Sequence, residues 1–166
     1  MKKTINIIII ILILLVGCGI FVREVVFPIK DKKIIEKYAK EYNVKPELIA
    51  SIIHFETDFN QIPYNKGKAC GLMKLTAKTG AELAKEIGEK NFKPEEIVNN
   101  DKNIQLGTYY LSKSNGKSLR DLVGNWSIRN GVEKDSKIDM KDYAGKFYTK
   151  KIENREKIYK VLYFMF

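Results

Sequence analysis

Apolar residues recur at helical spacing along most of the chain, and no segment alternates convincingly between apolar and polar positions. The first helical segment outside the N-terminus follows Asp31 and carries Ile34, Ile35, Tyr38 and Tyr42. The pattern predicts an all-α fold, or nearly so, in which strands play little part.

A second helix is predicted to begin at Pro46, because proline fits the first turn of a helix. Its apolar positions form one stripe, which consists of Leu48, Ile49, Ile52 and Ile53. Glu56 follows Ile53 by three residues and Ile52 by four, so it continues this stripe toward the interior. A carboxylate on the buried side of a helix is costly unless it is paired or used.

Further helices are predicted downstream. Thr76 is predicted to cap one helix and Asp101 the next, and another is predicted to start near Leu119. The last region, residues 139–166, is rich in Lys, Tyr, Ile and Phe at helical spacing. These segments together account for a compact helical domain.

The N-terminus contains an apolar run of 18 residues, Ile5–Val22, preceded by Lys2 and Lys3. As a helix this run extends about 27 Å, which reaches the minimum for a membrane span. No A-x-A-like cleavage site follows, and this favours an uncleaved, single-pass signal anchor over a cleaved signal peptide. The two lysines favour a cytoplasmic N-terminus and a domain on the outer face of a bacterial cell membrane.

A second interpretation of the N-terminus stays open, because Leu15–Cys18 reads "LVGC" and resembles the lipobox of bacterial lipoproteins. In that case Cys18 would be acylated. Under either interpretation the chain divides into a membrane segment, residues 1–22, a connector, residues 23–30, and a domain, residues 31–166.

Charge and cysteine usage narrow the function classes. Lys and Arg number 30 against 20 acidic residues, a formal net charge of +10, which favours polyanionic surroundings. The charges are spread without a dense basic run, so nucleic-acid binding is not predicted. Cys18 and Cys70 are too far apart in the predicted organisation to form a disulfide, and no Cys/His cluster suggests a metal. No cofactor is predicted.

Glu56 is the candidate for chemistry. Burial disfavours a charged carboxylate, and a carboxyl that holds its proton near neutrality can act as a general acid on a glycosidic bond. On this basis Glu56→Gln should leave folding unharmed or improved. Asp58 and His54 each lie two residues away and so face other sides of the helix. The alternative is a half-solvated Glu56 paired with a lysine.

Three motifs and a tyrosine-rich C-terminal region occur in a specific order. The motifs are "ETDFN" at 56–60, "GKACGLMKL" at 67–75 and "NIQLGTYYL" at 103–111. In this order they resemble the soluble-lytic-transglycosylase-like family, whose fold is related to goose-type lysozyme. The resemblance covers about residues 31–163 and implies a lysozyme-like helical domain.

The resemblance also implies a reaction. Glu56 would be the single acid/base that cleaves peptidoglycan glycan strands between N-acetylmuramic acid and N-acetylglucosamine, leaving a 1,6-anhydro end. Neither a metal nor a cofactor is implied. The positions implied to bind substrate are Thr57, Met73, Lys74, Asn125, Trp126 and Tyr143.

Some positions depart from the family pattern. Lys74 replaces a glutamine, and alignment through Leu119, Leu122 and Val132 puts Asn125 where the family has a tyrosine that holds the glutamate. These departures predict that cleavage is slow and that the substitution Asn125→Tyr accelerates it. Trp126 would either stack on a sugar or pack in the core. A lysozyme-like hydrolase and a glycan-binding domain that does not cut remain alternatives.

Overall fold

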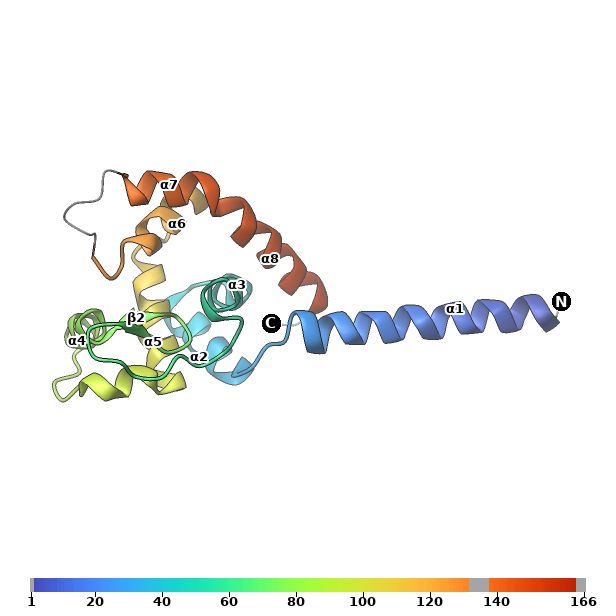
Figure 1. Ribbon diagram of the computed structural model, residues 1–166, viewed down its shortest axis with the longest axis horizontal. Coiled ribbons are helices and arrows are strands. Elements are labelled where there is room, and N and C mark those ends of the chain that lie inside the picture. Colours follow the sequence, from blue (N-terminus) through green and yellow to red (C-terminus); the bar gives the residue numbers. More distant parts are fainter. Residues whose placement is uncertain (1, 132–137, 164–166) are drawn as a thin grey trace. The chain divides into compact units, whose positions relative to one another are not determined.

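The computed structural model describes residues 2–131 and 138–163. The chain forms two units, Met1–Lys30 and Asp31–Phe166, which are described separately (Figure 1). The predicted helical character is confirmed in both units. It follows from the 3.6-residue apolar period, which lets each helix bury one face against its neighbours.

The first unit is a single apolar rod. Helix α1 spans Lys2–Phe21 and continues as a π-helical segment, η1, over Val22–Val26. The stretch Lys3–Val26 is long and apolar enough to cross a membrane by length and composition, and none of it is buried in the protein. An N-terminal signal sequence has the same properties, so the stretch fits both interpretations of the N-terminus.

The second unit is a helical domain with one small hairpin (Figure 1). Its elements in chain order are α2 (Lys32–Tyr42), α3 (Pro46–Thr57), β1 (Ala69–Cys70), β2 (Leu75–Thr76), α4 (Ala77–Glu86), the 3-10 helix η2 (Pro94–Val98), α5 (Asn100–Ser112), α6 (Leu119–Ser127), α7 (Met140–Phe147) and α8 (Thr149–Leu162). The strands are antiparallel and pair Ala69 with Thr76 and Cys70 with Leu75.

Helix α3 lies at the centre of this domain, packed against α2 and α8. Pro46 occupies its first turn, as predicted, and Asp58 ends it in a left-handed conformation with φ +50°. Burial extends beyond the predicted stripe, because Ala50 and Ser51 are also fully buried. A helix covered on several faces holds its last turn rigidly, and that turn carries Glu56.

The helix caps follow the prediction in one case and depart from it in another. Thr76 caps α4 and accepts a hydrogen bond from the Thr79 amide. The cap of α5 is Asn99, which accepts from Lys102, so the prediction of Asp101 was wrong. Asp101 instead accepts the hydroxyl hydrogen of Tyr38 at 2.6 Å, which ties α5 to α2.

The turn between β1 and β2 is fixed by Asn103, a fully buried residue of α5. Its side chain accepts from the Met73 amide at 2.7 Å and donates to the Ile97 carbonyl at 2.7 Å. Gly71 passes so close that an added Cβ would lie 2.3 Å from Asn103 Nδ2, and its φ is +73°. Only glycine fits both constraints, and the turn that results brings Lys74 beside α3.

Candidate active site

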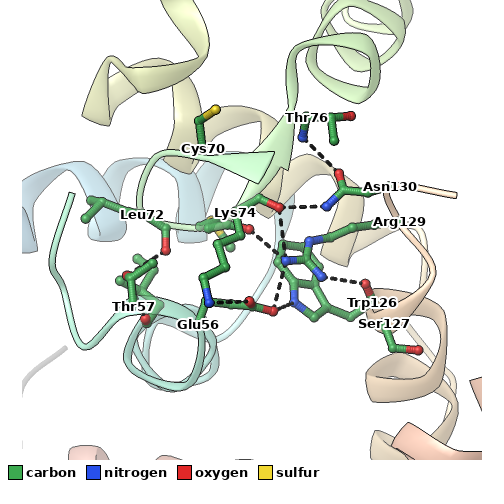
Figure 2. A network of polar contacts seen from close by, with 12 residues as sticks. Glu56, Thr57, Cys70, Leu72, Lys74, Thr76, Trp126, Ser127, Arg129 and Asn130 are labelled. Carbon is green, nitrogen blue, oxygen red and sulfur yellow. Dashed lines mark hydrogen bonds and ion pairs between the residues drawn. The ribbon is translucent and has the colours of Figure 1, made fainter. Parts of the chain in front are cut away.

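Glu56 is held in the last turn of α3 with its side chain 11% exposed (Figure 2). Its Oε1 accepts a hydrogen bond from Trp126 Nε1 at 2.8 Å and pairs with Arg129 Nη2 at 2.9 Å. Its Oε2 lies 4.0 Å from Lys74 Nζ. The polar contacts of Glu56 are therefore with cations and an indole donor, whereas the sequence suggested apolar surroundings.

Arg129 follows the end of α6, and its side chain is only 6% exposed. Its Nη1 donates to the Trp126 carbonyl at 2.9 Å, and its Nη2 lies 3.1 Å from the carbonyls of both Met73 and Lys74. The guanidinium also lies over the indole of Trp126, 4.1 Å from the ring centroid. Burial lowers the pKa of Arg129, whereas the nearby Glu56 carboxylate raises it.

Lys74 occupies the β1–β2 turn in a left-handed conformation with φ +45°. Its carbonyl accepts from Asn130 Nδ2 at 2.8 Å, and Asn130 Oδ1 accepts from the Thr76 amide at 2.9 Å. Its side chain is 41% exposed and reaches toward Glu56 (Figure 2). The structure thus brings together Glu56 and Lys74, two of the residues singled out from the sequence.

Two other predicted substrate-binding residues are buried instead. The Thr57 hydroxyl lies 2.8 Å from the Leu72 carbonyl and 3.1 Å from the Ile53 carbonyl, so it donates to one of them. The Met73 side chain is fully buried and lies so close to Gly107 that any Cβ there would clash with its sulfur. These side chains fix the turn against α3 and α5, and they offer no surface to a substrate.

At the end of α6, the contact with Glu56 that was expected from position 125 is made by Trp126. Asn125 Nδ2 donates to Ser114 Oγ at 3.0 Å, and the donor to Glu56 is Trp126. Trp126 is 2% exposed, with Arg129 over its ring and Tyr110 edge-on at 5.8 Å. Its burial leaves no face on which a sugar could stack. Val132, used to align this segment, lies outside the described residues.

Tyr143 belongs to an aromatic cluster on the outer side of α7. It is 37% exposed and lies 4.7 Å from the ring of Phe147 and 5.8 Å from that of Tyr148, centroid to centroid. Tyr148 in turn contacts Phe55, the residue before Glu56, at 5.3 Å. The cluster is an accessible aromatic surface that connects to the last turn of α3.

Asp58 and His54 pair with one another and not with Glu56. The ion-pair distance from His54 Nε2 to Asp58 Oδ1 is 3.1 Å, and His54 Nδ1 lies 2.7 Å from the Tyr159 hydroxyl. Asp58 is 72% exposed, whereas the His54 side chain is 12% exposed. Burial, followed by the charge of Arg155, lowers the pKa of His54, and Asp58 opposes this.

Arg129 and Asn130 are the site residues that the sequence did not reveal. Neither belongs to a recognised motif, and 73 positions separate Glu56 from Arg129, so only the tertiary fold shows the contact. Within residues 2–131 and 138–163, no group of three His, Cys, Asp or Glu side chains could hold a metal. A cavity of about 760 Å³ elsewhere, between the start of α3 and α8, contains none of the Glu56 contacts.

Comparison with known families gives a match to the transglycosylase SLT domain over residues 33–126. Among curated proteins, the endo-type membrane-bound lytic murein transglycosylase A of Enterobacter sp. (strain 638) is 41% identical over 79 residues, 46% of this chain. The protein of the same name from Citrobacter koseri is 37% identical over 79 residues. The chain covers 39% of the length of each relative.

A solved structure gives the same architecture. Lytic transglycosylase Slt from Pseudomonas aeruginosa, determined as an inactive mutant, matches with a TM-score of 0.68 over 83% of this chain and 25% of that protein. Sequence identity is 20%, so this likeness concerns the fold. It confirms the prediction of a lysozyme-like helical domain.

Proposed function

Because the chain belongs to the transglycosylase SLT domain family, we propose that it is a lytic transglycosylase that cleaves peptidoglycan, with Glu56 as its acid/base. One observation carries the proposal. Glu56 projects from the rigid last turn of the central helix, and its Oε1 is held by buried donors while its Oε2 lies next to the partly exposed Lys74. A fixed carboxyl with one oxygen outside these buried hydrogen bonds suits proton transfer to a bound glycan.

The proposed reaction uses one carboxyl twice. Protonated Glu56 gives its proton to the oxygen between N-acetylmuramic acid and N-acetylglucosamine as the bond to the muramyl anomeric carbon breaks. The carboxylate then takes the proton of the muramyl 6-hydroxyl, whose oxygen bonds to that carbon. A 1,6-anhydro end forms, no water is consumed, and Glu56 is again protonated.

Within residues 2–131 and 138–163, the surroundings of Glu56 favour a single-carboxylate mechanism over that of a retaining hydrolase. Such a hydrolase places a second carboxylate about 5 Å from the first. Asp58, the acid nearest in sequence, is turned to His54 and lies at the exposed end of α3. Tyr143 and its aromatic neighbours would contribute sugar-binding surface, since aromatic rings pack on the apolar faces of sugars.

The proposed location follows from the N-terminal unit and from the relatives, which are named membrane-bound. Residues 1–22 would hold the domain at the outer face of a bacterial cell membrane, next to the glycan strands. Acylation of Cys18 is the alternative means of attachment. Residues 23–30 would then act as a short connector between membrane and domain.

A second candidate function is glycan binding without cleavage. The contact that favours it is the ion pair of Glu56 with Arg129, because an adjacent cation stabilises the carboxylate, which cannot act as an acid. Binding of peptidoglycan with no cut product would identify this function.

The test is incubation of the full chain in detergent micelles with purified peptidoglycan, followed by mass spectrometry of the soluble muropeptides. We expect products with anhydro ends, lighter by one water than the products of hydrolysis. Muropeptides with reducing ends would show a lysozyme-like hydrolase. Bound but uncut glycan would show the binding domain.

A further inference from the structure

The two oxygens of Glu56 have different surroundings. Oε1 meets two buried donors, Trp126 Nε1 at 2.8 Å and Arg129 Nη2 at 2.9 Å. Oε2 has one partner among the described residues, the more distant Lys74 Nζ at 4.0 Å, on a side chain that is 41% exposed. A neutral carboxyl has one oxygen that accepts and one that carries hydrogen. Because both donors point at Oε1, Oε1 is the acceptor, and Oε2 is the oxygen that carries hydrogen when the carboxyl is neutral.

Arg129 does not depend on Glu56 for its position. Its two terminal nitrogens bond to three backbone carbonyls, those of Met73, Lys74 and Trp126, and its plane rests on the Trp126 ring. The guanidinium therefore stays in place when Glu56 gains or loses a proton. It is a fixed charge 2.9 Å from the oxygen that it contacts, in a site with little solvent screening.

We propose that Arg129 is a positioning residue for Glu56, which anchors Oε1 and assigns proton transfer to Oε2. The second point rests on the proposed function, and the first does not. A fixed cation favours the carboxylate, which helps the step that removes the 6-hydroxyl proton and opposes the step that protonates the leaving oxygen.

In the described part of the chain, the other groups near the carboxyl act in the same direction or are neutral. Lys74 approaches from the β1–β2 turn and adds a second, screened positive charge. Tyr110 on α5 lies against Trp126, and burial raises its pKa, with Arg129 opposing, so it is uncharged near neutrality. Among the described residues, the ionic partners of Glu56 are Lys74 and Arg129.

The test compares Arg129→Gln with Arg120→Gln in the full chain in detergent micelles. Arg120 pairs with Asp142 on the surface, where both side chains are more than half exposed, so its loss matches the change in net charge alone. The carbon-13 resonance of the Glu56 carboxyl, assigned by its absence from Glu56→Gln, is followed against pH. We expect the titration of this resonance to move to higher pH in Arg129→Gln and to match wild type in Arg120→Gln.

The cleavage profile gives the second readout. If protonated Glu56 limits the rate, the alkaline limb of the profile should move to higher pH in Arg129→Gln, and the maximal rate should fall because Oε1 has lost one of its two anchors. Wild-type protein supplies a measurement that needs no substitution. The nitrogen-15 signals of the Arg129 guanidinium should shift with the same midpoint as the Glu56 carboxyl.

The outcomes separate this inference from the proposed function. An upward shift in Glu56 protonation without cleavage by any variant supports the role of Arg129 and overturns the transglycosylase. Cleavage with an unchanged Glu56 midpoint in folded Arg129→Gln overturns the role of Arg129 and leaves the enzyme intact. If Arg129→Gln does not fold, the wild-type protein decides the matter. Guanidinium signals of Arg129 that do not shift at the pH where Glu56 titrates would overturn the inference.

Discussion

Trp126 donates its indole hydrogen to Glu56 Oε1 over 2.8 Å and so joins the end of α6 to the last turn of α3. The donor is 2% exposed, and its ring is covered by Arg129 and Tyr110. A buried donor of this kind cannot rotate away to water. Trp126 therefore fixes the orientation of the carboxyl.

Trp126→Phe keeps most of the ring packing and removes this donor. A hydrogen bond to a charged group contributes about 1.5–3 kcal/mol, which corresponds to a fall in cleavage rate of about 10- to 100-fold. The rate is measured on purified peptidoglycan. The matched control is Tyr110→Phe, which removes a hydroxyl that donates to the Asn125 carbonyl and touches no atom of Glu56. Equal losses in both variants would contradict an orienting role for Trp126.

Glu56→Gln should reduce cleavage by at least about 100-fold, because the side chain no longer titrates. Its effect on stability is the reverse of the expectation from sequence. The structure shows that the amide would leave the Arg129 charge buried without a counter-ion. We expect a loss of about 1–3 kcal/mol in the free energy of unfolding, less than for a broken buried pair because the amide oxygen still accepts.

Urea unfolding followed by circular dichroism measures that loss. Glu86→Gln is the control, since Glu86 pairs with Lys113 at the surface and the substitution is chemically identical. It should change stability by less than about 1 kcal/mol. The double variant Glu56→Gln/Arg129→Gln should lose less free energy of unfolding than the sum of the losses in the two single variants. Additive losses would mean that the two charges do not interact.

Asn125→Tyr is now expected to bring no gain in rate. The acceleration predicted from sequence assumed that position 125 faces Glu56, and the structure gives that contact to Trp126. The substitution would also remove the hydrogen bond from Asn125 to Ser114. The added volume at a half-buried site would lower the free energy of unfolding by about 1–3 kcal/mol. Melting temperature and turnover should be measured together. Faster cleavage by a folded variant would restore the alignment through Val132.

The sequence was informative where local periodicity determines the structure. The spacing of Ile52, Ile53 and Glu56 predicted that the carboxylate lies on the inner side of its helix, and Pro46 marked the start of that helix correctly. Strands of two residues are too short to show alternation, so the β1–β2 hairpin left no signal. The same pattern gave no reason to distinguish Asn99 from Asp101 as a cap.

The partners of Glu56 were not predictable from such patterns. Arg129 reaches the carboxylate because α6 ends beside the β1–β2 turn, and its charge is tolerated there because three backbone carbonyls also accept from it. This geometry depends on the packing of distant segments. The sequence therefore identified the candidate acid and, as an alternative, a lysine partner, which Lys74 supplies at 4.0 Å, but it gave no sign of the buried Arg129.

His54 should make stability depend on pH. Burial and Arg155 lower its pKa in the folded protein below the ordinary value of 6.5. The unfolded chain therefore binds more protons between those two values, and stability rises with pH across that interval. The contribution of neutral His54 to stability should be fully present above about pH 6.5. It should be lost as the pH falls through the pKa of His54 in the folded protein.

His54→Gln should remove this contribution, and the effect is easy to isolate because His54 is the only histidine in the chain. The melting temperature is measured from pH 5 to 8 for both proteins. The wild-type curve should decline more steeply toward pH 5 than the curve of the variant. Parallel curves would show that His54 does not contribute to the pH dependence.

Lys74→Gln places at this position the glutamine that the family resemblance implies. The ammonium lies 4.0 Å from Glu56 Oε2, on a side chain that is 41% exposed, so its effect is screened by solvent. An exposed pair contributes about 0.2–1 kcal/mol, which corresponds to a change in rate of less than about 6-fold. Because the lost cation had stabilised the carboxylate, cleavage near neutral pH should become faster at low salt. At 1 M salt, where the Debye length is about 3 Å, the rates should converge.

Lys78→Gln, on the exposed side of α4, controls for weaker attraction to the polyanionic wall. If Lys74→Gln cleaves more slowly than this control at every salt concentration, Lys74 holds the substrate and its charge does not act on Glu56.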